Sequence, residues 1–184
     1  MKRLFVFIAT LLMAAVMMTA QDGTRKYGIK SGTVKAVMDM MGQKVETTSW
    51  FDDYGALEAS VTKMGGMEIT TISKGGKSWM VNPSVKMVQE VPVQESVNYL
   101  DLTDEAVQKY KVKEMGKETL LNRECTTYSL EVSQMGQTAK LRVSVWEGYP
   151  LKAVTEAMGS TVTVTVTKFV EGPVESEVFE IPEY

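Results

Sequence analysis

Residues Gly116–Phe169 read GKETLLNRECTTYSLEVSQMGQTAKLRVSVWEGYPLKAVTEAMGSTVTVTVTKF, and this stretch decides the fold class because its apolar and polar residues alternate with period two. Along Gln137–Trp146, apolar residues occupy every second position. This is the pattern of a strand with one face toward a core and the other toward water. Valine and threonine alternate in the same way along Thr161–Val170. Both segments are predicted to be half-buried β-strands.

Short turn-forming segments separate the strands of this stretch. They are Gln134-Met135-Gly136, Glu147-Gly148-Tyr149-Pro150 and Met158-Gly159-Ser160. Glycine in so short a connection favours a hairpin between neighbouring strands. The stretch therefore predicts an antiparallel meander.

The rest of the chain repeats the pattern. Further strands are predicted over Ile29–Met41, Gln43–Phe51, Leu57–Met64, Met67–Ser73, Lys77–Val81, Val85–Val91, Val112–Leu120, Glu124–Val132 and Leu151–Met158, and an extended tail over Pro173–Tyr184. One short helix is predicted over Leu100–Lys111, because Thr103 suits an N-cap and Asp104 and Glu105 suit a positive first turn. The fold class is mainly β, with about ten strands and one helix.

The N-terminus has the layout of a secretory signal peptide. Lys2 and Arg3 precede an apolar run that ends at Met18, and Thr19-Ala20 precede polar residues. The run is shorter than the ~20 residues of a membrane-spanning helix, which disfavours a retained anchor. We predict that residues 1–20 are removed and that residues 21–184 form a single β-rich domain. That domain is expected to be soluble in the periplasm or secreted from a bacterial cell, with no stable membrane span.

The charge of the mature chain limits its partners. Residues 1–20 hold two of the 20 basic residues and none of the 23 acidic residues, so the mature net charge is 18 − 23 = −5. A mildly acidic surface argues against nucleic acid and anionic membranes.

Cys125 is the single cysteine, so no intramolecular disulfide forms. It has three interpretations: an inert buried thiol, an intermolecular disulfide, or a reactive nucleophile. The nucleophile is disfavoured because the chain contains no histidine to activate it.

The predicted sheet has more apolar surface than the predicted helix can cover. Three arrangements hide such a surface. The sheet closes or folds into a sandwich, it curls into an open half-barrel around a groove, or another molecule covers it.

Three stretches also resemble a known family. They are Gly116–Tyr128, Val145–Lys152 and Val178–Tyr184, and they resemble exported bacterial proteins catalogued as a domain of unknown function. That family is similar to the LolA-like superfamily of periplasmic lipoprotein carriers, whose fold is a strongly curved antiparallel sheet with helices in its mouth. The resemblance implies an apolar concave face able to receive an acyl chain. This chain lacks the carriers' long N-terminal helix, and no motif carries a ligand-contacting residue over to a numbered position.

The methionines form the first group of candidate ligand-binding residues. Four of the 14 methionines lie in residues 1–20, which leaves ten, and five of these precede glycine: Met41, Met64, Met115, Met135 and Met158. Four of the Met-Gly steps lie at predicted hairpin ends and are expected to cluster at one rim of the sheet. The candidate ligand-binding methionines are Met38, Met40, Met64 and Met67, because the spacings Met38-Asp39-Met40-Met41 and Met64-Gly65-Gly66-Met67 bring sulfurs near one another. Flexible thioethers adapt to varied apolar ligands, bind soft ions such as Cu(I), or fill gaps in a core.

Trp50 and Trp146 complete the candidate site. Each falls on the more polar face of its predicted strand. An aromatic ring in that position marks a ligand platform, a packing contact or a β-bulge.

These observations lead to a non-enzymatic interpretation. The chain has no phosphate-binding glycine motif, zinc pattern or hydrolase elbow, so we predict no catalytic residue and no cofactor. The leading hypothesis is a periplasmic binding or carrier protein for a hydrophobic ligand, either a lipid or a lipoprotein acyl chain. The alternative is an envelope protein-interaction module whose apolar face is covered by a partner or by self-association. A third hypothesis is soft-metal binding through methionines.

Overall fold

The structure of the protein is a computed structural model that describes residues 25–40, 42–93, 97–134 and 137–184. The predicted signal peptide, Met41 and Met135 lie outside the described residues. The described residues form eleven strands: β1 (Gly32–Met40), β2 (Gln43–Asp52), β3 (Leu57–Met64), β4 (Met67–Lys74), β5 (Lys77–Asn82), β6 (Met87–Val91), β7 (Lys113–Leu120), β8 (Arg123–Gln134), β9 (Gln137–Trp146), β10 (Tyr149–Ala157) and β11 (Ser160–Glu171). They are joined by one described α-helix, α2 (Asp104–Tyr110), and three short 3-10 helices: η1 (Asp53–Gly55), η2 (Pro83–Val85) and η3 (Ser176–Phe179).

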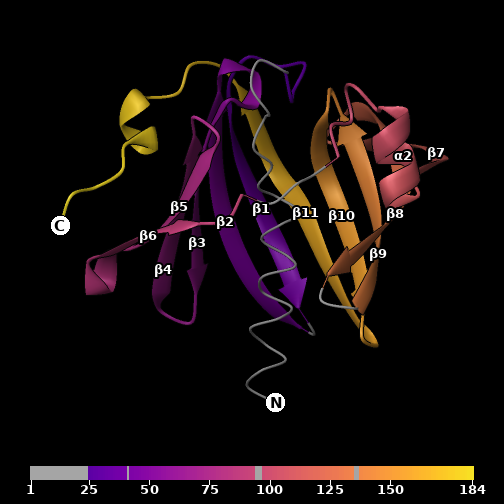
Figure 1. Cartoon of the computed structure of the whole chain (residues 1–184). Helices are drawn as coiled ribbons and strands as arrows, with labels where there is room; N and C mark the ends of the chain where they lie inside the picture. The colour runs from indigo at the N-terminus through magenta and orange to yellow at the C-terminus, as the bar shows by residue number, and fades with distance from the viewer. Residues whose placement is uncertain (1–24, 41, 94–96, 135–136) are drawn as a thin grey trace.

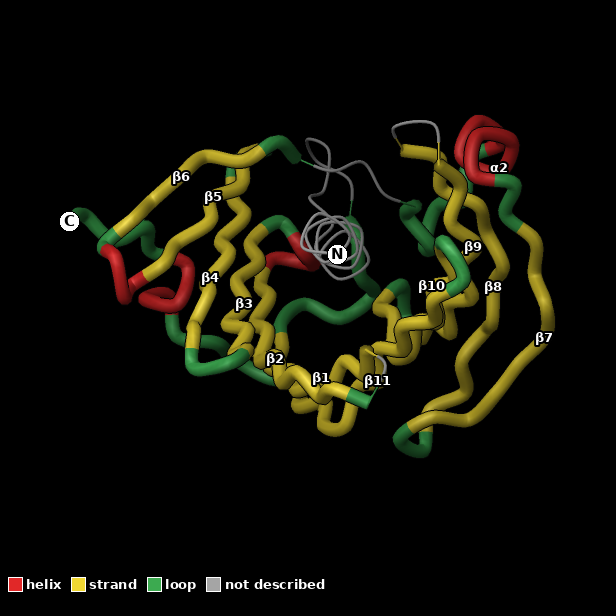
Figure 2. The backbone as a smooth tube through the Cα atoms, turned by 90° about the horizontal axis from the view of Figure 1, so that it is seen from below, coloured by secondary structure: helices red, strands yellow, loops and turns green. Residues whose placement is uncertain are grey.

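All eleven strands belong to one antiparallel sheet. Their order is β6-β5-β4-β3-β2-β1-β11-β10-β9-β8-β7, so β6 and β7 are the edges of the described sheet and do not meet (Figure 1). Figure 2 shows the sheet bent into an open trough with a concave and a convex face. The predicted half-barrel of about ten strands with one short helix is confirmed.

The first and last strands join two meanders. Residues 32–91 form one run of hairpins and residues 113–171 form another, and β1 pairs with β11 between them. The register of this pair places Met38 opposite Val164, and it shifts at a bulge between Lys35 and Ala36. No local sequence signal predicts this long-range pair.

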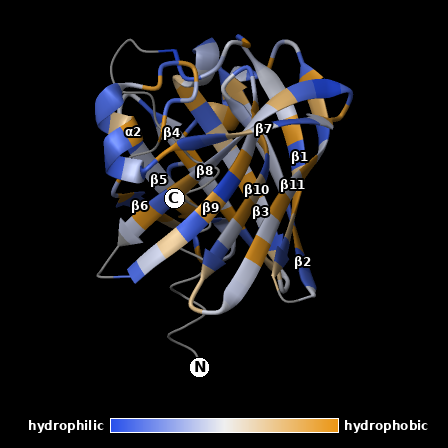
Figure 3. Ribbon diagram, turned by 90° about the vertical axis from the view of Figure 1, so that its right-hand side faces the viewer, coloured by the Kyte–Doolittle hydropathy of each residue, from blue (hydrophilic) through white to orange (hydrophobic). Residues whose placement is uncertain are grey.

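The two faces of the sheet follow the alternation predicted from the sequence, and Figure 3 shows hydrophobic and hydrophilic residues alternating along the strands. The concave face of the central strands carries Val34, Ala36, Val162, Val164 and Val166, all buried. Threonines of β11 lie on the opposite face and are half-buried or exposed. Burying one face in this way supplies the hydrophobic stabilisation of the sheet.

Three segments cover parts of the sheet. Residues 25–31, which we call the lead, cross the concave face at the upper end in Figure 1. Residues 97–112, which include α2, pack on the concave side of β8, β9 and β10 through Val97, Tyr99 and Val112. The tail, residues 173–184, packs on the convex side of β3, β4 and β5 and buries Phe179 against Ala59 and Ile72.

Most predicted strand ends are within two residues of the observed ones, the tail predicted as extended contains η3, and two elements start three or more residues later than predicted. The predicted strand Ile29–Met41 starts only at Gly32, because Lys30 accepts a hydrogen bond from the Tyr54 amide at the upper end instead of entering the sheet. The predicted helix Leu100–Lys111 was too long, and the observed helix begins at Asp104. The Asn98 side chain accepts a hydrogen bond from the amide of Leu100, which holds the preceding residues in a loop.

The N-cap of α2 is as predicted. Thr103 Oγ1 accepts a hydrogen bond from the amide of Ala106 at 3.2 Å, and Asp104 and Glu105 lie in the first turn. Replacing Thr103 with alanine should lower the free energy of unfolding by about 1 kcal/mol, because it leaves one amide of the first turn without its partner. Urea denaturation measures this change, and Thr103→Ser, which keeps the hydroxyl, should remain within about 0.5 kcal/mol of the native protein. An equal loss in both variants would contradict a capping role.

Candidate functional site

The concave face holds a buried charged network among aromatic rings at its upper end and methionines at its lower end. We call the end of the sheet at Gly32, Phe51 and Glu171 the upper end, and the end with the β1–β2 and β3–β4 hairpins the lower end, as they appear in Figure 1. The lead, residues 25–31, lies inside the bend of the sheet (Figure 2).

The lead is hydrogen bonded to both halves of the sheet at the upper end. The amides of Lys26 and Tyr27 donate to the carbonyl of Tyr54, and the amide of Gly28 donates to the carbonyl of Glu147 at 2.8 Å. Gly148, with φ +77°, permits this approach, because a Cβ there would lie 2.6 Å from the Lys26 carbonyl oxygen. The lead is thus a bridge between the β2–β3 connection and the β9–β10 hairpin.

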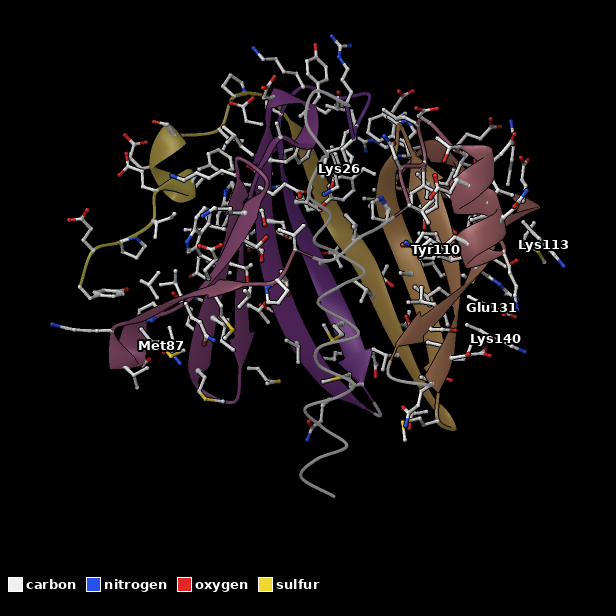
Figure 4. All side chains as sticks on the ribbon, in the orientation of Figure 1. Lys26, Met87, Tyr110, Lys113, Glu131 and Lys140 are labelled. Atoms are coloured by element: carbon white, nitrogen blue, oxygen red, sulfur yellow. The ribbon has the colours of Figure 1, made fainter. Side chains whose placement is uncertain are left out.

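A buried charged network fixes the lead to β3. Lys26 Nζ and Tyr27 Oη both donate hydrogen bonds to the carboxylate of Glu58, and the Tyr27 bond is 2.6 Å long. All three residues are buried, and Figure 4 shows Lys26 pointing into the upper part of the molecule. The Tyr27 ring packs 5.0 Å from Phe51 and 4.8 Å from Tyr149, measured between ring centroids.

Removal from water controls the protonation of this network. Burial lowers the pKa of Lys26 to about 8 in spite of the attraction of Glu58, and burial raises the pKa of Glu58. Burial likewise raises the pKa of Tyr27 well above its ordinary value. The polar atoms of the three side chains are hydrogen bonded to one another, and within the described residues no buried side-chain nitrogen or oxygen is without a hydrogen-bond partner. The network is thus suited to hold the lead in place.

The lower end of the concave face is rich in methionine. Met38 and Met40 continue the row of Val34 and Ala36 along β1 and are half-buried against it. Met64 and Met67 face each other across the β3–β4 hairpin and are 37% and 52% exposed. The period of two along β3 and β4 assigns both to the concave side, as it does for Ser60 and Thr71. The four predicted methionines are therefore on one face and at one end of the sheet.

The two predicted tryptophans lie elsewhere. Trp50 is paired with Ala59 on the convex face and packs under the tail. Trp146 lies at the upper end, where its ring is 5.5 Å from that of Phe169 and the Arg123 guanidinium lies 4.4 Å from the ring centroid. The structure does not bring either tryptophan to the methionines.

Sequence reasoning did not identify the Lys26, Tyr27 and Glu58 network. Glu58 occupies the polar half of the alternation of β3, a position that the pattern assigns to solvent. It is buried because the lead covers that side. Lys26 and Tyr27 are adjacent in the sequence, and nothing in their local sequence indicates that both side chains bind Glu58.

Cys125 is fully buried, and its Sγ lies 3.5 Å from the carbonyl oxygen of Arg123. Burial raises the pKa of the thiol, which favours the inert form. This arrangement agrees with the buried-thiol interpretation.

The described residues show no carboxylate or cysteine cluster suited to a metal ion, since no three Asp, Glu or Cys side chains gather at a possible site. A hard cation or zinc would need such a cluster. The described helices are also too short or too polar to cross a bilayer. What the lower end of the concave face offers is apolar contact, through Met38 and Met40 beside the buried valines.

Comparison with known proteins identifies solved structures that share this fold. No family model matches the chain, and no curated protein matches its sequence. Among solved structures, an uncharacterised conserved protein from Thermus thermophilus matches with a TM-score of 0.60 and 11% identity, over 84% of this chain and 86% of that one. Pseudomonas aeruginosa MucB, solved in complex with MucA, matches with a TM-score of 0.56 and 16% identity, over 80% of this chain and 54% of that one. The match to MucB thus spans about half of that chain, and both matches show a shared fold.

Two further solved structures match with lower TM-scores. A putative outer membrane lipoprotein-sorting protein domain from Vibrio parahaemolyticus matches with a TM-score of 0.41 and 12% identity, over 83% of this chain and 90% of that one. A protein of a domain-of-unknown-function family is among the matches as well.

Proposed function

We propose that the protein is a non-enzymatic carrier in the bacterial envelope that binds a single hydrophobic chain on the lower half of its concave face. The ligand is a lipid or the acyl chain of a lipoprotein. Met38 and Met40 contact it from β1, and Met64 and Met67 contact it from the β3–β4 hairpin. Trp50 and Trp146 have packing roles.

One observation carries this proposal. A row of apolar side chains runs along β1 from the buried Val34 to the half-buried Met38 and Met40, beside the valines of β11. The lead covers the upper end of this row, and residues 97–112 cover β8 to β10. Flexible, polarizable methionines at the lower end suit an apolar ligand without fixed shape. The fold that the chain shares with other proteins supports a concave apolar surface but does not select a ligand.

A fatty-acid probe tests the proposal. Binding of cis-parinaric acid, measured by its fluorescence, should weaken about tenfold or more in the double variant Met38→Gln/Met40→Gln, because two apolar contacts are replaced by amides that lose solvation on binding. Glutamine has nearly the same length as methionine, so the backbone of β1 should be retained. Circular dichroism verifies this.

The matched control is Met115→Gln on the edge strand β7. Met115 is 56% exposed and lies far from β1 in the strand order, so this variant should bind the probe as the native protein does. Failure of the native protein to bind the probe, or equal weakening in both variants, would contradict the assigned site.

A protein partner is the second candidate function. The MucB structure contains MucA, so the same fold occurs in a protein that binds another protein. Native mass spectrometry of the protein purified from its own envelope separates the candidates. A monomer with co-purified lipid supports the carrier, and a lipid-free protein with a bound polypeptide supports the interaction module.

The soft-metal hypothesis is abandoned if Cu(I) titration shows no affinity that depends on Met38 and Met40.

A further inference from the structure

The two edges of the described sheet differ in their protection. Strand β7 carries four charged residues and a bulge near Gly116, which are devices that prevent a second strand from pairing with an edge. Strand β6 has the sequence MVQEV, pairs with β5 without a bulge and carries one charged residue, Glu90. β6 is therefore the unprotected edge.

The first four side chains of β6 are exposed, on both faces of the strand, and Val91 is half-buried. Met87 is 37% exposed and Val88 is 36% exposed, and Figure 4 shows Met87 at the outer margin of the molecule. β6 pairs with β5 on one side, and no other described strand pairs with it on the other. A short apolar strand in this state presents free backbone groups as well as apolar side chains.

The hydrogen-bonding pattern identifies the free backbone groups. A two-residue loop, Gly75-Gly76, closes the β4–β5 hairpin at the pair Lys74 and Lys77, and the pair next to such a loop is hydrogen bonded. Because backbone groups alternate in direction along a strand, the amide and carbonyl of Ser78 in β5 point toward β6, where Ser78 is paired with Val91. It follows that Met87, Gln89 and Val91 use their backbone groups toward β5. The amides and carbonyls of Val88 and Glu90 point outward.

The open edge is limited at both ends. Before β6, Lys86 has φ 50° and ψ 45°, so the extended conformation begins only at Met87. After it, Pro92 has no amide hydrogen, and the alternation assigns it to an outward position. A long extended peptide paired along this edge would therefore lack a hydrogen-bond donor opposite one of its carbonyls at Pro92. The five-residue edge instead fits a strand of its own length, which a second copy supplies.

We propose that two copies of the protein associate by antiparallel pairing of β6 with β6, with Gln89 on the two-fold axis. In this register Met87 lies opposite Val91 at both ends, and Val88 lies opposite Glu90. Every outward amide and carbonyl of Val88 and Glu90 then finds a partner in the other copy. No like charges face each other, and the two sheets become continuous.

The expected affinity is modest. Five residues from each copy make a contact smaller than a stable dimer interface, so a dissociation constant on the order of 100 µM is expected. The contact leaves the concave side of β1 accessible, since four strands separate β1 from β6 in the sheet. Dimer formation and ligand binding are thus measured independently.

Sedimentation velocity of the purified protein from about 10 µM to 1 mM tests the proposal. Val88→Pro removes the outward amide at a position where an edge strand tolerates proline. Because the two-fold symmetry removes two hydrogen bonds, the dissociation constant should rise roughly 30-fold. Val88→Ala keeps the amide, and its constant should stay within about threefold of the native value.

A cross-linking experiment fixes the register without relying on proline. Residues on the axis in a non-hydrogen-bonded pair lie about 4.5 Å apart between Cα atoms, which a disulfide can span. Gln89→Cys should therefore form covalent dimers under mild oxidation, whereas Met115→Cys on β7 should not, and Cys125 is buried in both. A monomer at 1 mM, a dimer unaffected by Val88→Pro, or equal cross-linking in both cysteine variants would overturn the proposal.

Discussion

Glu58→Leu is expected to lower the free energy of unfolding by about 4 kcal/mol at pH 7, because it leaves the buried Lys26 without its counter-charge and Tyr27 without its acceptor. Urea denaturation measures the loss. Without Glu58 the pKa of Lys26, already lowered by burial, falls further, so the folded state holds fewer protons than the unfolded state. The deficit should therefore shrink as the pH rises from 7 to about 8 and stay constant above that, because Lys26 of the native protein then loses its proton as well.

Two controls distinguish a buried pair from an ordinary ion pair. Glu68 contacts Lys63 at 3.5 Å with both side chains exposed, so Glu68→Leu should cost less than about 1 kcal/mol. The triple variant Lys26→Met/Tyr27→Phe/Glu58→Leu removes every polar member of the network and should regain stability to within about 1 kcal/mol of the native protein. A loss of less than about 1 kcal/mol in Glu58→Leu would contradict the role assigned to the network.

Stability is also expected to fall steeply above pH 10. Burial raises the pKa of Tyr27, Tyr99 and Tyr149, so the folded protein keeps these phenols neutral while the unfolded chain ionises them. The stability that they contribute is complete below their ordinary pKa of 10 and is lost as the pH rises above it. Each contributes about 1.4 kcal/mol per pH unit, or roughly 4 kcal/mol per unit for the three together.

Denaturation at several pH values and tyrosinate absorbance at 295 nm measure this effect together. Tyr99→Phe should reduce the slope by about one third, since one of the three phenols is removed. In the native protein, the absorbance of the three buried tyrosines should appear only with unfolding. If all seven tyrosines ionise near pH 10 while the protein is folded, the prediction is wrong.

The local structure was predictable from alternation and turn chemistry. The period of two along Gln137–Trp146 predicted β9 to the residue, and Thr103 predicted the N-cap of α2. These features depend on neighbours within a few residues in the sequence, where propensity and pattern are informative.

The features that were missed depend on contacts distant in sequence. Glu58 is separated from Lys26 by 32 residues, and its burial follows from where the lead crosses the sheet. Trp50 lies on the more polar face of β2, which is the convex face. It is covered there because the tail, with Phe179, packs on that face. Alternation distinguishes the two faces of a strand, but it does not predict that segments distant in the sequence will cover both faces.

The pairing of β1 with β11 also has a consequence for synthesis of the chain. These neighbours in the middle of the sheet are about as far apart in sequence as the described residues allow, and closing so long a loop is slow. A ribosome completes β11 last among the strands, so until then the chain holds two separate half-sheets whose central borders, β1 and β10, lack their common neighbour. A holding chaperone that shields these two borders during that interval would reduce aggregation of the nascent protein.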